Sequence, residues 1–408
     1  MIVCQRYLLW AYSVCVFLPI TIPWVVLGLG IALTLVMIAK ERKYTPPPLF
    51  APLLALALCV TLSGLVGHTF TDGLDALISL KALLVYFWAH YALSKMPEER
   101  LCVLLILLCA GGLDGIWGMI QQLFNFHPGE KYQYLQATGF VKNPMAFAGE
   151  MQVTACMSLA LCLGLKQVTL PIPKYVLLVL TLANFLGVIF ASERSAWLGI
   201  AVAVLVMAFF VSRKLFGLTL LSGIALVCLL WFTVPVVKTR LEPLLTNAQN
   251  DTSTRVRFSI WQESYGMWYQ GPILGRGINN FPKLNYKEAI VPGISEHLTH
   301  AHSNYLHLLV CLGLPGLGIF LILLAMTFYL GMSNWFMGPN GLDKALGLGV
   351  IGALVSLSVA GIFEYNFGAG HVRLISWFVF AFLLSLYPLA SPAQRSETHS
   401  SDDAGHGD

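Results

Sequence analysis

The sequence predicts an all-α polytopic membrane protein with about twelve transmembrane helices and one large outer loop that contains amphipathic helices. Hydrophobic residues make up 57% of the 408 residues and charged residues only 11%, less than half the share in an average soluble domain. The mean hydropathy is +0.74. The apolar residues also gather in long runs, so the composition excludes a soluble enzyme and a disordered chain.

Each predicted span is a mostly apolar run, because a helix needs about 20 such residues to cross the hydrocarbon core of a bilayer. The runs cover residues 7–20, 22–39, 49–67, 76–94, 101–124, 144–165, 175–191, 195–211, 215–234, 304–330, 345–363 and 374–388. The first run is not followed by a small-residue cleavage site, so we expect it to be retained as a helix.

Lysines and arginines in the short loops predict the orientation, since cytoplasmic loops carry an excess of them. With the N-terminus inside, twelve basic residues fall on the inner side, and only Lys131, Lys142, Arg194 and Arg373 fall in short outer loops. Both termini are therefore expected in the cytoplasm. The net charge of +4 is too small to suggest that the protein binds nucleic acid.

Four regions follow from these spans. Residues 1–234 form a predicted N-terminal transmembrane bundle, and residues 235–303 form the outer loop that carries the site. Residues 304–390 supply the C-terminal transmembrane helices, and residues 391–408 form a polar cytoplasmic tail that is expected to be disordered. The nine cysteines fall mostly in apolar runs without the spacing of a disulfide framework or a metal site.

The outer loop contains a predicted amphipathic helix from Ser253 to Tyr269. Aromatic residues recur along it at helical spacing, which favours a position along the membrane interface: Phe258, Trp261, Tyr265, Trp268 and Tyr269. A structural anchor explains these rings best. Arg255 and Arg257 lie beside them at headgroup depth, and a guanidinium group suits the recognition of phosphate.

A glycine-rich segment follows this helix at residues 271–281, where two glycines flank Arg276. Such glycines allow a tight turn that would hold the guanidinium near an anionic group, although a plain turn has the same pattern. A second arginine, Arg194, follows a short outer break between two predicted spans. An arginine at the end of a span also extends its charged group to the interface as a purely structural feature.

The outer loop closes with His297, His300 and His302, directly before Asn304 enters a span. Alternate residues share a face only in a strand, and no carboxylate or cysteine cluster completes a ligand set, so no metal is expected. A neutral imidazole at the start of a helix is better placed as a general base, with a packing role as the alternative. The last outer connection holds Glu364, Asn366, His371 and Arg373.

Arginines, an aromatic helix and histidines thus gather at the outer membrane boundary. A lipid-linked diphosphate substrate needs this combination, because cations bind the diphosphate, aromatic rings contact sugars and a base accepts a proton. Lys81, Asp114 and Glu150 are the only lysine, arginine, aspartate or glutamate residues within the predicted spans, and three scattered residues do not define an ion pathway. The two halves of the chain also show no repeat of the kind that transporters use.

The sequence resembles the O-antigen ligase and polymerase superfamily. The resemblance rests on Arg257-Phe-Ser-Ile-Trp261, on Gly271-Pro-Ile-Leu-Gly-Arg-Gly-Ile-Asn-Asn-Phe281, on His300-Ala-His-Ser-Asn-Tyr-Leu-His307 and on Leu312-Gly-Leu-Pro-Gly-Leu-Gly318. It covers residues 190–330, and the Ser-x-Arg-Ser-x-Trp run at 192–197 is similar to a further family element.

The resemblance implies a multi-span glycosyltransferase of the GT-C-like type that needs neither metal nor cofactor. It would move a glycan from undecaprenyl diphosphate to an acceptor, lipid A-core or another glycan, at the periplasmic face of a bacterial inner membrane. His302 matches the family's catalytic histidine. Arg194 and Arg276 match arginines that engage the diphosphate, and Arg257 is a third candidate for that role.

The remaining candidate residues, Arg255, His300, Asn304 and Trp261, are predicted to contact the substrate. Transfer would invert the anomeric centre. Ligation to lipid A-core is favoured over polymerisation of carrier-linked repeats, and a transporter of the same superfamily is the third alternative.

Overall fold

The computed structural model describes residues 1–42, 44–67, 70–126, 136–164, 168–246, 252–271, 273–278, 281 and 300–385, and all regular secondary structure within these ranges is helical. The first half of the chain contains α1 (Ile2–Cys15), α2 (Thr21–Glu41), α3 (Phe50–Gly67), α4 (Phe70–Ser79), η1 (Leu80–Ala82), α5 (Leu83–Lys95), η2 (Pro97–Glu99), α6 (Arg100–Phe124), α7 (Pro144–Leu163), α8 (Lys174–Phe190) and α9 (Arg194–Val211). The second half contains α10 (Arg213–Thr233), α11 (Pro235–Thr246), α12 (Thr252–Tyr269), α13 (Asn304–Met337), α14 (Gly341–Phe363), η4 (Asn366–Gly368) and α15 (Gly370–Leu384).

Helix lies within the described part of each predicted span, and the protein is a multi-pass membrane protein, whereas the count of twelve spans stays a prediction. Eight helices within the described residues are long and apolar enough to cross a membrane, and α3, α8 and α15 are shorter apolar helices. The predicted tail at residues 391–408 lies outside the described residues.

Two predicted spans differ in shape from simple helices. The span at 76–94 joins α4 to α5 through the 3-10 turn η1, and the helical segment begins earlier, at Phe70. The span at 304–330 extends to Met337 as α13 and is kinked at Gly313, whose φ of 65° lies in the left-handed region. Pro315 follows two residues later and has no N–H to donate to the carbonyl of Cys311, so the helix loses a hydrogen bond there.

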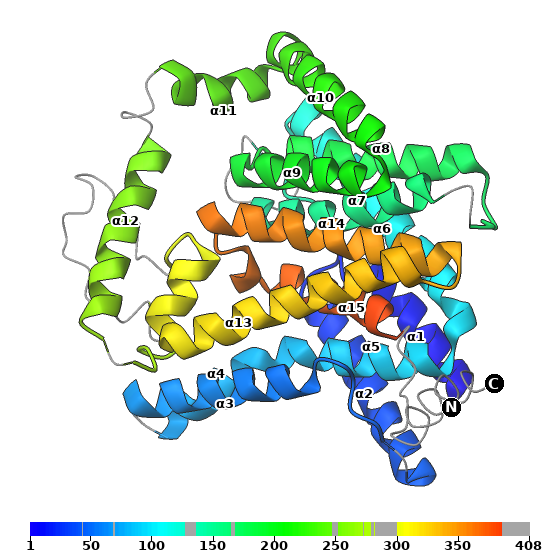
Figure 1. Ribbon diagram of the computed structural model, residues 1–408, viewed down its shortest axis with the longest axis vertical. Helices are drawn as coiled ribbons and strands as arrows, with labels where there is room; N and C mark the ends of the chain where they lie inside the picture. The colour runs from blue at the N-terminus through cyan, green and yellow to red at the C-terminus, as the bar shows by residue number, and fades with distance from the viewer. Residues whose placement is uncertain are drawn as a thin grey trace, which may run out of the picture.

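The core of the bundle is formed by α14, which packs against α7, α9 and α13. Small residues let these helices approach closely, since Gly347 of α14 lies against Gly331 of α13, and Gly199 of α9 lies against the backbone of Ser356. Helices of the predicted regions 1–234 and 304–390 therefore form one bundle (Figure 1). By contrast, α10 has no buried residue and contacts α9 and α11.

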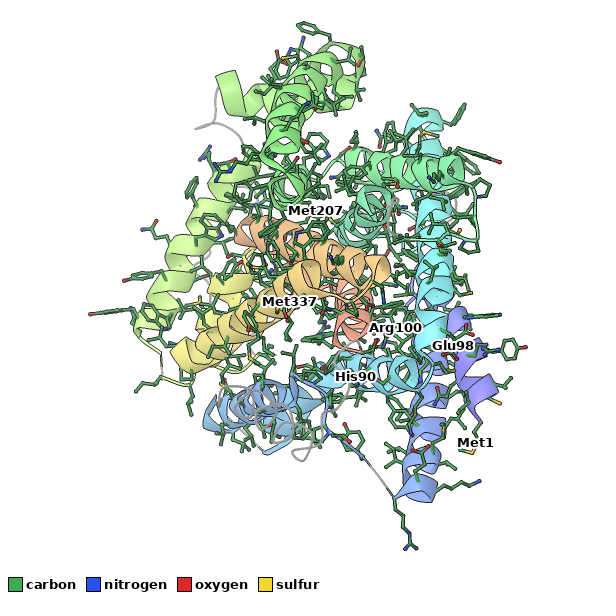
Figure 2. All side chains as sticks on the ribbon, turned by 45° about the vertical axis from the view of Figure 1, so that its right-hand side comes forward. Met1, His90, Glu98, Arg100, Met207 and Met337 are labelled. Atoms are coloured by element: carbon green, nitrogen blue, oxygen red, sulfur yellow. The ribbon has the colours of Figure 1, made fainter. Side chains whose placement is uncertain are left out.

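Residues that were predicted on the inner side contact one another. Arg6 forms an ion pair of 2.7 Å with Glu99, Lys95 forms one of 2.6 Å with Glu41, and Arg100 donates to the carbonyl of Ser385. Figure 2 shows Met1, Glu98 and Arg100 in the same part of the molecule, while Figure 1 shows α12 at the opposite edge.

The loop that is predicted to lie outside, residues 235–303, contains two helices within its described part, α11 and α12. The observed α12 matches the helix predicted from Ser253 to Tyr269 and packs against α13. Its aromatic residues divide into two groups: Trp261 and Trp268 are partly buried, whereas Phe258, Tyr265 and Tyr269 are each more than half exposed. The exposed rings are available to a membrane interface, and the partly buried ones face the protein.

Candidate active site

The start of α13 sets the backbone of the predicted catalytic histidine. His302 has a φ of 44°, a left-handed conformation that costs a non-glycine residue about 1–3 kcal/mol and is concentrated at functional sites. Directly after it, the side chain of Ser303 accepts a hydrogen bond from the N–H of Leu306 and caps α13. The chain therefore turns sharply at His302 and then enters the helix.

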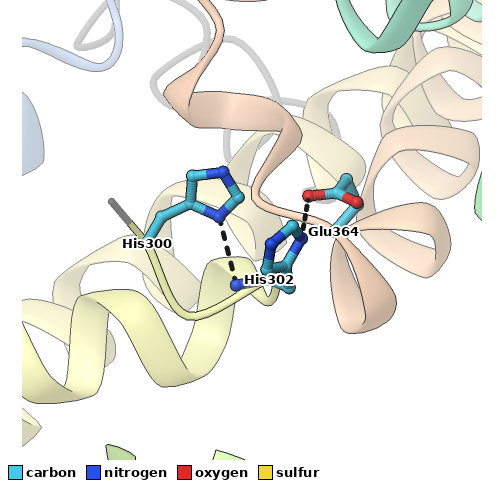
Figure 3. A group of neighbouring side chains, drawn as sticks. All are labelled: His300, His302 and Glu364. Atoms are coloured by element: carbon cyan, nitrogen blue, oxygen red, sulfur yellow. Dashed lines mark hydrogen bonds and ion pairs between the residues drawn. The ribbon is translucent and has the colours of Figure 1, made fainter. Parts of the chain in front are cut away.

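Glu364 directly follows α14 and contacts two of the predicted site residues. Its Oε1 accepts a hydrogen bond of 2.9 Å from Nδ1 of His302, as Figure 3 shows. Its Oε2 forms an ion pair of 3.2 Å with the guanidinium of Arg257, whose Nε also donates to the carbonyl of Phe363 at 3.0 Å. Only 6% of the Glu364 side chain is exposed, so the ends of α12, α13 and α14 meet at a buried carboxylate.

The charges of this cluster are mutually compensating. Burial alone raises the pKa of Glu364, but the hydrogen bond from His302 and the electrostatic effects of His302, Arg257 and His300 lower it to about 2. Burial lowers the pKa of His300 to about 4, and the nearby His302 adds to this effect. His300 is therefore neutral near pH 7, and its Nδ1 accepts a hydrogen bond of 3.2 Å from the backbone N–H of His302.

Arg194 is positioned by the turn between α8 and α9. Ser192 adopts a φ of 58°, and the indole N–H of Trp197 donates to the carbonyls of Val188 and Ile189 at 3.0 and 3.2 Å. The indole thus ties the first turn of α9 to the last turn of α8. This accounts for the Ser-x-Arg-Ser-x-Trp pattern, since Arg194 becomes the first residue of α9.

A cavity of about 1180 Å³ joins these elements, and Arg194, Arg257, Trp261, His302 and Glu364 all line it. Its charged lining comes from the ends of α9, α13 and α14 and from α12, whereas the bodies of α9 and α10 supply a long apolar wall. Small-molecule sites usually occupy about 300–1,000 Å³, so this cavity has room for a ligand with a sizeable apolar part.

Two groups in this lining have hydrogen-bonding capacity that no described residue uses. Nε2 of His302 is one, because the ring's bond to Glu364 runs through Nδ1. The buried indole N–H of Trp261 is the other. Together with the two arginines, the cavity offers a proton acceptor, a neutral donor and two cations beside apolar surface.

Arg276 belongs to a different environment, the glycine turn formed by residues 271 and 273–278. Its Nε donates to the carbonyl of Met267 at 3.2 Å, and Arg276 is not among the residues that line the cavity. The N–H groups of Arg276 and Gly277 donate to the carbonyls of Val310 and Cys311 at 3.0 and 2.8 Å. The turn thus satisfies carbonyls near the kink of α13.

Glycine is required on both sides of this contact. Gly275 has a φ of 76°, and a Cβ at this position would clash with the carbonyl of Cys311. A Cβ on Gly313 would clash with the carbonyl of Ile273. The tight turn predicted around Arg276 is therefore present, and it is packed against α13.

The other predicted contact residues also lie apart from the cavity. Arg255 is exposed on α12 and does not line it. Asn304 is buried, donates to the side chain of Asn366 at 2.7 Å and accepts from the N–H of Phe367 at 3.2 Å, so its amide links α13 to η4. His297 lies outside the described residues.

The expectation that no carboxylate joins the histidines is wrong. Ligand atoms of His300, His302 and Glu364 lie within 4.8 Å of one another, because the left-handed backbone of His302 brings the two rings together. Nδ1 of His302 bonds to Glu364, Nδ1 of His300 accepts from the backbone N–H of His302, and Glu364 also pairs with Arg257. A cation would have to break these contacts beside a guanidinium. The arrangement suits a hydrogen-bonded base better than a metal site.

Sequence reasoning missed three residues of this lining. Glu364 was noted only as part of the last outer connection, and it lies 62 positions after His302. Gln136 and Glu193 also line the cavity, and Nε2 of Gln136 donates to Glu193 at 3.0 Å. Glu193 directly precedes Arg194 in the 192–197 run, where it stands at a position that the pattern leaves open. Glu364 and Gln136 reach the site through the packing of distant segments, so no local pattern marked them.

Residues 177–321 match the family model described as O-antigen ligase. This segment of the chain is similar to the O-antigen ligase family. The matched segment begins within α8 and ends within α13, so it contains Arg194, Arg257 and His302 but not Glu364. The match confirms the resemblance to the O-antigen ligase superfamily over this segment. No curated protein matches the chain.

Proposed function

We propose that the protein is an O-antigen ligase-type transferase, which moves a glycan from undecaprenyl diphosphate to lipid A-core. The reaction would take place at the periplasmic face of a bacterial inner membrane, with both termini in the cytoplasm. One observation carries this proposal: a single cavity joins two arginines and a histidine with an unused ring nitrogen to a long apolar wall. A diphosphate bound to a polyprenyl chain has matching charged and apolar parts.

The proposed reaction is a single displacement. Nε2 of His302 accepts the proton of the acceptor hydroxyl as its oxygen attacks the anomeric carbon of the glycan. The bond from that carbon to the diphosphate breaks, and its electron pair leaves with the diphosphate. Arg194 and Arg257 stabilise the negative charge that develops there, so the step needs no metal and inverts the anomeric centre.

The indole N–H of Trp261 is proposed to donate to the substrate in the same cavity. His300 supports His302 through the backbone. Arg255, Arg276 and Asn304 remain sequence-based candidates, and the contacts around the last two favour a role in the fold.

Deletion of the gene, followed by gel analysis of lipopolysaccharide, tests the proposal. Loss of every O-antigen band, with carrier-linked polymer still present, would identify a ligase. A band with a single repeat would identify a polymerase, and an unchanged pattern would contradict both and leave a transporter as the remaining alternative. Restoration by wild-type protein, but not by His302→Ala at equal membrane abundance, would assign the activity to this cavity.

Independence from metal is a separate part of the proposal. Membranes treated exhaustively with chelator are expected to retain the transfer activity. Loss of activity that returns on addition of a divalent cation would instead assign His300, His302 and Glu364 to a metal ion.

A further inference from the structure

We infer that Glu364 is the positioning residue of this site: its carboxylate fixes the ring of His302 and ties that ring to Arg257. The inference rests on the proposed function. Glu364 lies outside the matched domain, and sequence reasoning gave it no role. Its two oxygens bond to side chains from two other segments, with Oε1 on His302 at 2.9 Å and Oε2 on Arg257 at 3.2 Å.

The first consequence concerns the tautomer of His302. A carboxylate only accepts hydrogen bonds, so the neutral ring must carry its proton on Nδ1. Nε2 is then left with a lone pair, as a general base requires. Without Glu364, the proton is free to move to Nε2, and the ring can also rotate away from the acceptor.

The second consequence concerns charge. When His302 takes the acceptor's proton, the ring becomes an imidazolium beside a carboxylate that remains ionised, because the pKa of Glu364 is about 2. The other groups that face this carboxylate are Arg257 and the neutral His300, and the N–H of Tyr365 also donates to Oε1 at 3.1 Å. Glu364 therefore stabilises the protonated base without taking the proton itself.

The third consequence concerns distance. Arg257 is held by Oε2 and by the carbonyl of Phe363, so the same chain end anchors the base and an arginine proposed to bind the diphosphate. The proton acceptor and the leaving-group cation thus keep a fixed separation. Proper orientation of reacting groups contributes substantially to enzymatic rates.

The test is a pH–rate profile of purified Glu364→Gln, Glu364→Asp and wild-type protein. Membranes from the deletion strain, which accumulate the carrier-linked glycan, serve as substrate, and the initial rate of its consumption is measured from pH 5 to 9. Glu364→Gln keeps the size of the side chain but removes its charge, so we expect a rate about ten- to a thousandfold lower. The acidic limb of its profile should move to lower pH, because an amide does not stabilise the imidazolium.

Glu364→Asp retains the charge and should recover part of the rate with the acidic limb near its wild-type position. Glu242→Gln is the matched control, since Glu242 lies exposed on α11 and does not line the cavity. Its rate and profile should equal those of the wild type. If Glu364→Gln does not accumulate in the membrane, the Glu364→Asp profile decides. An acidic limb of that profile at clearly lower pH than in the wild type would overturn the inference.

A Glu364→Gln protein with a uniformly lower rate and an unchanged profile would also overturn the inference, because a merely structural role predicts that result. His302→Ala, assayed in parallel, separates this failure from failure of the proposed function. An inactive His302→Ala beside a fully active Glu364→Gln would refute the role of Glu364 alone. If both variants were fully active, the proposed base would be refuted as well.

Discussion

Two arginine-containing regions of this protein look alike in sequence but have different surroundings in the structure. In the cavity, Arg257 meets the buried carboxylate of Glu364 and lines a large space together with Arg194. In the glycine turn, Arg276 donates to the carbonyl of Met267, and its backbone bonds to α13. Both regions were predicted to bind the diphosphate, and only the first combines cations with room for a ligand.

The difference follows from what each backbone must satisfy. The kink at Gly313 and the missing N–H of Pro315 disrupt the hydrogen bonds of α13, and the glycine turn supplies N–H groups to the carbonyls nearby. At the cavity, Arg257 also donates to a helix carbonyl, that of Phe363, but its guanidinium in addition pairs with Glu364 and lines the cavity. Similar residues are therefore proposed to bind a ligand in one region, and they stabilise the fold in the other.

The largest expected effect comes from His302→Ala, which removes the proposed base. We expect the transfer rate to fall by about 10²- to 10⁴-fold, as for loss of general-base catalysis. The rate per molecule is measured with solubilised protein and carrier-linked glycan, after the amount of folded protein has been matched. His371→Ala is the control, because His371 bonds to the carbonyl of Leu18 and does not line the cavity. Full activity of His302→Ala would remove the cavity from the mechanism.

Arg194→Gln should have the next largest effect, since it removes one cation from the diphosphate. We expect a loss of about 10²-fold in rate, which is the scale for removing one group that stabilises the leaving charge. Arg255→Gln, on the exposed side of α12, should change the rate by less than about threefold. Equal losses for the two variants would show that the cavity lining does not identify the diphosphate ligands.

Arg276→Ala should mainly affect stability. It removes a charged hydrogen bond to the carbonyl of Met267, so we expect the free energy of unfolding to fall by about 1–2 kcal/mol. Thermal unfolding in detergent measures this change, and the rate per folded molecule should stay within about threefold of wild type. A hundredfold lower rate at unchanged stability would show that Arg276 takes part in the reaction. It would contradict the proposed difference between the two regions.

His300→Gln should have the smallest effect, and only at acidic pH. Because burial lowers the pKa of folded His300 to about 4, the unfolded state binds a proton first as the pH falls below about 6.5. Stability is therefore lost between pH 6.5 and 4 in the wild type, and His300→Gln should flatten that part of the stability profile. Identical pH dependence in both proteins would contradict the burial of a neutral His300.

The helix positions could be predicted from sequence because a bilayer imposes long apolar runs that are visible without any tertiary contact. The kink in α13 and the 3-10 turn before α5 could not be placed in the same way. A side chain is excluded at Gly313 because its neighbours in space, such as Ile273, leave no room for a Cβ atom. Such features depend on packing partners far away in sequence.

The site shows the same limit. His302, Arg194 and Arg257 were recognisable from local motifs, and the structure brings all three to one cavity. Glu364 has no motif of its own and becomes part of the site because α14 ends beside the start of α13. Strand-like alternation also gave the wrong expectation for the two histidines, whose rings meet through a left-handed backbone at His302.

The exposure of α10 has a consequence for how a substrate reaches the site. No residue of this helix is buried. Among the described helices, it packs substantially only against α9 and α11. It also forms one wall of the cavity. A ligand with a long hydrocarbon tail, of the kind proposed, can then arrive sideways from the bilayer and need not cross the aqueous phase. For the proposed carrier-linked substrate, the search for the cavity would be diffusion in two dimensions, and the surface density of the carrier in the membrane would set how often the cavity is filled.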